Sequence, residues 1–217
     1  MNAFVNIDND SKLIRLDQIS GLCGIDASDI YEIYPYGSRV YGTNSEASDY
    51  DFIVVYTGDY EKDSQQYDSH DGRNSAHTYS VQKWKEHLVA HKMFALECTF
   101  LQGPYQKMPF ILDKTALRVE VSSKTSNSWV KCKKKLEVEN DYPTGIKSLF
   151  HSFRMPMFGI QIAKYGKIVD YSEANRLWFE EFKPMLTERP SWDAIKTIYQ
   201  PRHNALMSEF RTYAELK

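Results

Sequence analysis

The order of apolar and polar positions along the 217-residue chain predicts two different halves. In the first half, short β-prone runs alternate with amphipathic segments, and the clearest run is YDFIVVY, residues 50–56. A continuous apolar run of this kind is typical of a strand that is buried on both faces of a sheet. DIYEIYPY, residues 29–36, predicts the strand before it. HTYSVQKW, residues 77–84, predicts a third strand that runs into a helix near Ser80.

Apolar residues at helical spacing predict helices on either side of these strands. Residues 11–22 have the pattern of an amphipathic helix. Residues 81–92 have it too, with Val89 among the positions expected to face inward. The polar segment 57–76 predicts a hairpin connection or a mobile flap. The segment FALECTFL, residues 94–101, leaves helix and strand open as alternatives.

The second half of the chain has helical periodicity throughout. Helices are predicted over residues 114–138, over a following stretch that Gly166 ends, and over two later segments. Pro156 and Pro201 lie inside two of these stretches and are expected to kink or divide them, because proline has no main-chain N–H to donate.

These patterns predict an α/β (α+β) fold with a mixed sheet in residues 1–112, followed by a helical domain in residues 113–217. The composition agrees with a soluble globular protein, since 42% of the residues are hydrophobic and 26% are charged. The formal net charge is −2. Any contact with nucleic acid would therefore depend on a local basic patch and not on the overall field.

The sequence gives no sign of a membrane or secreted protein. No apolar run approaches the roughly 18 residues that a spanning helix needs. The first residues lack the basic-then-apolar order of a signal peptide. The three cysteines are widely spaced and suggest neither a disulfide framework nor a zinc site. We therefore expect a cytoplasmic protein with no membrane partner, and the oligomeric state is left open.

The candidate chemistry begins at YGSRVYGTNSEASDYDF, residues 36–52, where a Gly-Ser turn precedes two closely spaced aspartates. Gly37 permits a main-chain conformation closed to other residues and lets the chain approach a ligand. Ser38 offers a hydroxyl and an N–H at a helix start, where phosphate groups bind. Arg39 adds a charge for a phosphate or a carboxylate. The turn predicts a phosphate-binding position.

Asp49 and Asp51 alternate with Tyr50, and residues two apart in a strand point to the same face. Two such carboxylates repel each other unless a cation lies between them, and their oxygen donors suit Mg²⁺ or Mn²⁺. A triphosphate held at the turn would place its phosphates beside that metal. The segment therefore predicts one site for a triphosphate and a metal.

The stretch YGSRVYGTNSEASDYDFIVV resembles the Gly-Ser … Asp-x-Asp signature of the polymerase-β-like nucleotidyltransferase superfamily. HTYSVQKWKEHLVAHKMFALECTFL, GIKSLFHSFRMPMFG and GKIVDYSEA resemble its RNA-ligase-associated branch, found in bacteria and large phages. The resemblance implies a metal-dependent transfer of a nucleoside monophosphate from an NTP, with ATP expected, to an acceptor hydroxyl of RNA or tRNA, a small molecule or a protein. It also implies that Gly37 and Ser38 hold the triphosphate and that Asp49 and Asp51 bind the metals.

The superfamily usually has a third carboxylate, as base or metal ligand, on the strand after Asp-x-Asp. In this sequence that strand, NSAHTYS, has no acid. Glu97 is the expected catalytic acid by resemblance. Asp71 is a second candidate, and His77 could act as a base instead. Without a full set of acids, the protein would be a catalytically silent nucleotide-binding or regulatory module. A third possibility is a structural or interaction protein whose Asp-x-Asp is incidental.

Two basic groups lie in the helical half. Lys147, His151 and Arg154 fall at i, i+4 and i+7 on one helical face, which suits the β- and γ-phosphates of an NTP. By resemblance, the helical half is expected to close the nucleotide cleft. The second group could line a modest groove for RNA or tRNA with Trp129 as a stacking platform, although a solvated lysine face beside a core tryptophan is the alternative. Its lysines are Lys131, Lys133, Lys134 and Lys135.

Overall fold

The chain divides into two compact units. The computed structural model describes residues 4–6, 13–103 and 106–215. One unit comprises Met1–Val89 and Glu97–Lys107, and we call it the α/β unit. The other comprises Ala90–Leu96 and Met108–Lys217, and we call it the helical unit. The expected domain boundary at residue 112 and the expected closing of a cleft stay predictions.

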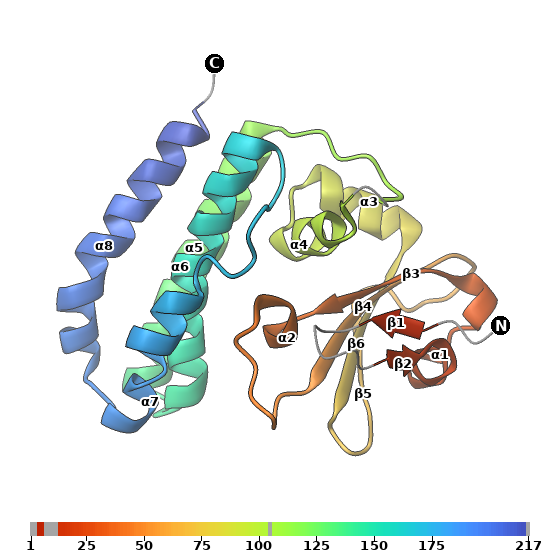
Figure 1. Ribbon diagram of the computed structural model, residues 1–217, viewed down its shortest axis with the longest axis horizontal. Helices are drawn as coiled ribbons and strands as arrows, with labels where there is room; N and C mark the ends of the chain where they lie inside the picture. The colour runs from red at the N-terminus through yellow and green to blue at the C-terminus, as the bar shows by residue number, and fades with distance from the viewer. Residues whose placement is uncertain (1–3, 7–12, 104–105, 216–217) are drawn as a thin grey trace. The chain divides into compact units, whose positions relative to one another are not determined.

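The α/β unit is built on a mixed four-stranded sheet, as the sequence predicts (Figure 1). The strands lie in the order β3-β4-β6-β5, and β4 is antiparallel to β3 and parallel to β6. β5 is antiparallel to β6. The bounds are β3 (Ile30–Tyr36), β4 (Tyr50–Tyr56), β5 (Gln65–Asp68) and β6 (Asn74–Ser80). Every residue of β4 after Asp51 is buried, which confirms the interpretation of its apolar run.

Two local expectations in this unit need correction. The predicted helix over residues 11–22 is wrong at its start, because β2 (Leu13–Arg15) pairs antiparallel with β1 (Phe4–Asn6) and α1 covers only Leu16–Cys23. Strand pairing satisfies the main-chain groups of those residues, so tertiary context overrides the helical period. Residues 11 and 12 lie outside the described residues. The segment 57–76 is not only a connection, because it contains the polar strand β5.

The two faces of the sheet have different coverings. On one face, α1 packs over a core of buried residues from β3, β4 and β6, among them Phe52, Val54 and Ala76. On the other face lies α3 (Val81–Val89), whose Trp84 stacks on Tyr34 with ring centroids 5.2 Å apart.

Two further expectations concern the segment after this sheet. Val89 was expected to face inward, but it is the last residue of α3 and 77% exposed. A side chain at a helix end has no following turn to pack against. The segment FALECTFL, for which the sequence allows a helix or a strand, is helical and lies within α4 (Met93–Leu101).

From residue 108 on, the described residues of the helical unit form three long helices and two shorter helical segments. Their bounds are α5 (Lys114–Glu137), α6 (Tyr142–Tyr165), the π-helical segment Leu177–Phe182, α7 (Met185–Glu188) and α8 (Trp192–Tyr213). Asp113 and Asp141 cap α5 and α6 by accepting hydrogen bonds from main-chain N–H groups of the first turn. Gly166 ends α6 in the left-handed conformation, as expected. Within the part of the chain that the structure describes, no helix is long and apolar enough to cross a membrane.

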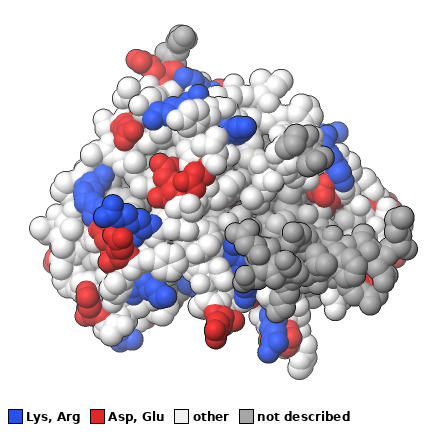
Figure 2. Space-filling view, viewed as in Figure 1, with Lys and Arg blue, Asp and Glu red and all other residues white. Residues whose placement is uncertain are grey.

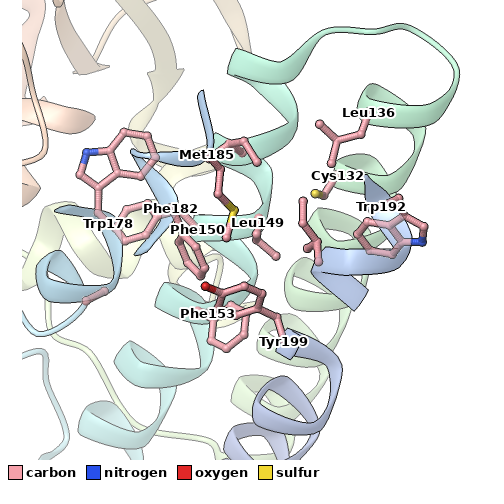
Figure 3. Packing of buried hydrophobic residues seen from close by; sticks show 13 residues of the cluster. Cys132, Leu136, Leu149, Phe150, Phe153, Trp178, Phe182, Met185, Trp192 and Tyr199 are labelled. Carbon is pink, nitrogen blue, oxygen red and sulfur yellow. The ribbon is translucent and has the colours of Figure 1, made fainter. Parts of the chain in front are cut away.

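The two prolines do not divide their helices. α6 continues through Pro156 and α8 continues through Pro201. A proline inside a helix removes one main-chain hydrogen bond. For Pro156 this loss is offset by burial, because the helix lies in a core of aromatic and aliphatic side chains (Figure 3). Ten of these side chains are labelled there: Cys132, Leu136, Leu149, Phe150, Phe153, Trp178, Phe182, Met185, Trp192 and Tyr199.

Candidate functional site

The Gly-Ser turn lies against the second aspartate. β3 ends at Tyr36, which pairs with Asp51 across the antiparallel ladder, so the next residue, Gly37, comes beside the Asp51 side chain. Gly37 has φ 79°, and a Cβ at this position would meet the carboxylate of Asp51, with Asp51 Cγ at 3.0 Å. No other residue fits without moving that carboxylate. The glycine therefore brings the main chain of the turn next to an acid.

The helix after the turn is short. α2 covers Ser38–Tyr41, and Gly42 caps its carboxyl end. A four-residue helix has almost no macrodipole, so any affinity for phosphate at this turn depends on local N–H and hydroxyl groups. Ser38 is partly exposed at its first position.

The two aspartates have different surroundings. Asp49 is exposed and lies one residue before β4, whereas Asp51 is partly exposed and lies within β4. The strand pleat therefore places Asp51, and the segment that leads into the strand places Asp49. Carboxylate oxygens at two such positions are the donors that Mg²⁺ and Mn²⁺ prefer.

Arg39 binds the segment that carries Asp49. Its Nε donates a hydrogen bond to the main-chain oxygen of Asp49 at 3.1 Å, and its Nη2 donates to the main-chain oxygen of Ser48 at 2.6 Å. Its guanidinium carbon lies 3.9 Å from the centroid of the Tyr50 ring. Arg39 thus contacts three consecutive residues directly before Asp51. Its expected contact with a triphosphate stays a prediction.

A serine occupies the sheet position beside Asp51. In the parallel pairing of β4 and β6, Asp51 is the register partner of Ser75, so both side chains lie on one face. On the other side of β6, Ser75 is the partner of Asp68 in β5. Hydrogen bonds from Gln66 and Ser75 hold the pKa of Asp68 below its usual range. The sequence did not predict this strand, because the residues of β5 are polar. For the same reason it did not indicate that Asp68 lies in the sheet beside Ser75.

Glu97, the expected catalytic acid, is a buried residue of α4. Its side chain is 1% exposed, and the hydroxyl of Tyr41 donates a hydrogen bond to its Oε2. Tyr41 is the last residue of α2 and packs edge-to-face on Tyr36, with ring centroids 6.3 Å apart. Glu97 is therefore connected to the short helix that follows the Gly-Ser turn. Its catalytic role stays a prediction.

The two alternatives to Glu97 have local roles in the sheet. Asp71 lies in the β5–β6 hairpin, where the hydroxyl of Ser69 at 2.6 Å and the main-chain N–H of Arg73 at 3.0 Å lower the pKa of Asp71. Burial lowers the pKa of His77 in β6, against the opposite effect of Asp68. Within residues 4–6, 13–103 and 106–215, no group of three His, Cys, Asp or Glu side chains could hold a metal ion.

The basic residues of α6 differ in burial along one helical face. Lys147 is exposed, His151 is partly buried and Arg154 is 1% exposed. Burial, together with the positive charges of Arg154, Lys131 and Lys147, lowers the pKa of His151 to about 3. His151 is therefore neutral at physiological pH, and the positive charge of this face comes from its neighbours.

The lysine run at the end of α5 is largely paired with acids. The pairs are Lys133–Glu137 at 3.7 Å, Lys134–Glu139 at 3.1 Å, Lys135–Glu139 at 2.5 Å and Lys135–Asp141 at 3.2 Å. Trp129 packs against Trp192 and His203, beside the core of the unit. On the face that Figure 2 shows, Lys and Arg side chains of the helical unit lie beside Asp and Glu side chains. The expected RNA groove stays a prediction, with acids close to its lysines.

Comparison with known proteins agrees with the site. A family model described as a nucleotidyltransferase domain matches residues 19–135, which is more than half of the chain. The chain therefore belongs to this nucleotidyltransferase family, and membership indicates a transferase that acts by nucleotidyl transfer. The matched residues include the Gly37 turn and both aspartates, and they end before α6. A search of curated proteins finds no match.

Proposed function

We propose that the protein is a metal-dependent nucleotidyltransferase that transfers a nucleoside monophosphate from an NTP, with ATP expected, to an acceptor hydroxyl. The observation that carries the proposal is the contact between the Gly37 turn and the Asp51 carboxylate. A turn that can approach phosphate and an acid that can bind a metal are adjacent, which is the arrangement that transfer at the α-phosphate requires.

The residues present fit a divalent cation. Asp49 and Asp51 supply hard anionic oxygen donors, and Asp49 is exposed to a ligand from solution. When bound by these two residues, Mg²⁺ or Mn²⁺ would supply charge neutralisation at the α-phosphate and activation of the acceptor hydroxyl.

The chain's own residues then have separate tasks. The main chain at Gly37 and the hydroxyl of Ser38 bind the leaving-phosphate side of the NTP. Glu97 is proposed as the third carboxylate, which accepts the proton of the acceptor hydroxyl. On α6, Lys147, His151 and Arg154 are proposed contacts of the β- and γ-phosphates. His151 would act there as a neutral imidazole.

The experiment that tests the proposal is incubation of the full chain with radiolabelled NTPs, Mg²⁺ or Mn²⁺, and candidate acceptors. The expected result is metal-dependent transfer of label, which is lost in an Asp49→Asn, Asp51→Asn double variant. Asp59→Asn is a matched control, because Asp59 is an exposed aspartate of the same unit outside the site. Equal transfer by the wild type and the double variant would overturn the proposal.

The register of β6 favours one alternative function. Ser75, and not an acid, lies beside Asp51, as would suit a nucleotide-binding or regulatory module without turnover. The same incubation separates the two functions. Binding of ATP that depends on Asp51, without transfer of label to any acceptor, would support the silent module.

The acceptor class is a further part of the proposal. The sequence leaves RNA or tRNA, a small molecule and a protein open as acceptors, and we propose RNA as the first to test. Incubation with RNA ending in a 3′-hydroxyl or a 3′-phosphate tests this proposal. Labelling of the hydroxyl-ended RNA alone is expected, and labelling of neither RNA while a protein or small molecule is labelled would contradict it.

A further inference from the structure

We propose that Arg39 is a positioning residue that holds the Asp49 segment in its metal-binding conformation, and that it acts through main-chain carbonyl groups. This inference rests on the proposed metal site. It assigns Arg39 a different role from the phosphate contact that the sequence suggests. The guanidinium contacts Ser48, Asp49 and Tyr50, the three residues that directly precede the strand aspartate.

The geometry of the contact uses what is particular to arginine. Nε and Nη2 lie on one edge of the planar guanidinium, and each donates to one of two consecutive carbonyl oxygens, of Asp49 and Ser48. The face of the same group stacks on the Tyr50 ring. A lysine has one ammonium group and no flat face, so it cannot make all three contacts.

The segment needs such a contact because Asp49 lies outside the strand. β4 begins at Tyr50, whose N–H donates to the main-chain oxygen of Arg73 at 2.8 Å. Tyr50 is also part of the buried core of the unit. Asp49, one residue earlier, is exposed. Its carbonyl accepts from Arg39, and the N–H of the same peptide, that of Tyr50, donates to Arg73, so Arg39 supplies one of the two contacts that orient the peptide after Asp49.

Arg39 is itself held by its position in the chain. It is the second residue of α2, directly after the turn in which Gly37 approaches Asp51. The turn therefore contacts Asp51 through Gly37 and the Asp49 segment through Arg39. Groups that hydrogen-bond the ligand side chains of a metal affect its affinity by about 10- to 100-fold when they are removed, and we take this range as the scale for Arg39, which holds the main chain at Asp49.

The experiment compares Arg39→Ala and Arg39→Lys with the wild type in the full chain. Mn²⁺ binding is measured by electron paramagnetic resonance without nucleotide, and ATP binding is measured separately. We expect Arg39→Ala to bind Mn²⁺ about 10- to 100-fold more weakly. Added guanidinium should restore most of this loss, whereas it should restore nothing in Asp51→Asn. Arg39→Lys should remain impaired.

A matched control is Arg73→Ala, because the Arg73 side chain is 81% exposed and lies near Asp71 in the hairpin. It should bind Mn²⁺ as the wild type does. Amide hydrogen exchange of residues 43–50 in metal-free protein gives a second readout, and Arg39→Ala should accelerate it. Unchanged exchange in that variant would overturn the inference whatever the metal result.

Other outcomes separate the inference from the proposed function. Wild-type Mn²⁺ affinity in Arg39→Ala, or weakened ATP binding with Mn²⁺ binding intact, would overturn the positioning role alone. Loss of Mn²⁺ binding that guanidinium does not restore would also overturn it. If the wild type and the Asp49→Asn, Asp51→Asn double variant bind Mn²⁺ equally, the proposed metal site fails, and hydrogen exchange still decides whether Arg39 holds the segment.

Discussion

The acidic residues of the α/β unit and the basic residues of α6 are placed by different means. Asp51 lies against the main chain at Gly37, and the carbonyl of Asp49 accepts from Arg39. The acids thus depend on a turn and on the segment before a strand. The basic residues of α6 take their positions from helical periodicity and from the depth at which each lies in the unit. Changes in neighbouring residues should therefore disturb the acids much more than the bases.

The largest effect expected from this comparison is that of Gly37→Ala. The variant has a left-handed φ and a Cβ in contact with the Asp51 carboxylate, so the acid must move. We expect nucleotidyl transfer to fall by at least about 100-fold, the scale of losing one aligned electrostatic contact in a transition state. Mn²⁺ binding should fall with it. Both are measured by the label-transfer and resonance assays.

Gly72→Ala is the matched control for that variant. Gly72 is in the same unit and also has a positive φ, of 66°, but a Cβ there would have no atom within 4 Å. It should lose about 1–2 kcal/mol of unfolding free energy from backbone strain alone and keep its Mn²⁺ affinity. Equal loss of Mn²⁺ binding in the two variants would show that strain, and not contact with Asp51, explains the result.

A second prediction concerns Glu97, which is buried in the same unit as the acids but placed by a helix. If Glu97 accepts a proton during transfer, Glu97→Gln should lower the rate by about 100-fold or more. Tyr41→Phe removes the hydroxyl that donates to Glu97 and leaves that buried carboxylate without this donor, so it should cost about 1–3 kcal/mol of stability and less than about tenfold in rate. Equal losses of rate in the two variants would mean that Glu97 acts only through Tyr41.

The sequence predicted those features of the α/β unit that are determined by residues close together in the chain. The apolar run of β4, the turn at Gly37 and the pairing of turn and acids each depend on a few neighbouring residues. β5 was missed because its residues are mostly exposed and polar, and its strand conformation comes from pairing with β6. The contacts of Arg39 were missed for a related reason. Its partners are main-chain carbonyl oxygens. Every residue has one, so the identity of the side chains does not indicate which of them Arg39 contacts.

In the helical unit, the sequence predicted the long helices. Of the two effects expected of Pro156, a kink or a division of the helix, the division does not occur. The expectation of a division assumed a helix stabilised only by its own hydrogen bonds. The surrounding core supplies packing that the local sequence does not show. The i, i+4, i+7 face of α6 was foreseen from spacing. The increase in burial from Lys147 to Arg154 depends on segments distant in the sequence, so the spacing of these residues did not predict it.

A third prediction uses the burial of His151. Its pKa is about 3 in the folded protein and about 6.5 when unfolded, so the unfolded chain binds more protons between these values. Stability from the neutral imidazole is therefore complete above pH 6.5 and is lost as the pH falls. We expect the unfolding free energy to fall by about 1–2 kcal/mol from this residue between pH 7 and pH 5. Chemical denaturation at both pH values measures it.

The matched variant is His151→Asn, which keeps a polar side chain that does not titrate. It should show a smaller difference in stability between pH 7 and pH 5 than the wild type. His203, whose pKa burial also lowers, remains in both proteins and accounts for part of the residual dependence. An identical pH dependence in the two proteins would contradict the assigned environment of His151. It would mean that burial and the positive charges of Arg154, Lys131 and Lys147 do not lower the pKa of His151.

The smallest effect is expected for the lysines at the end of α5. Lys133 and Lys134 form exposed pairs with Glu137 and Glu139, and such pairs contribute little to stability. Lys133→Gln, Lys134→Gln should change the unfolding free energy by less than about 0.5 kcal/mol per residue. The same variant tests the RNA groove, measured by the affinity for a single-stranded RNA at low salt. A modest weakening, of about a few-fold, is expected if RNA contacts these lysines in competition with the neighbouring acids. An unchanged affinity would mean that these lysines do not contact the RNA. A loss of 100-fold would mean that single contacts dominate binding at α5, as single contacts dominate the placement of the Asp49 segment.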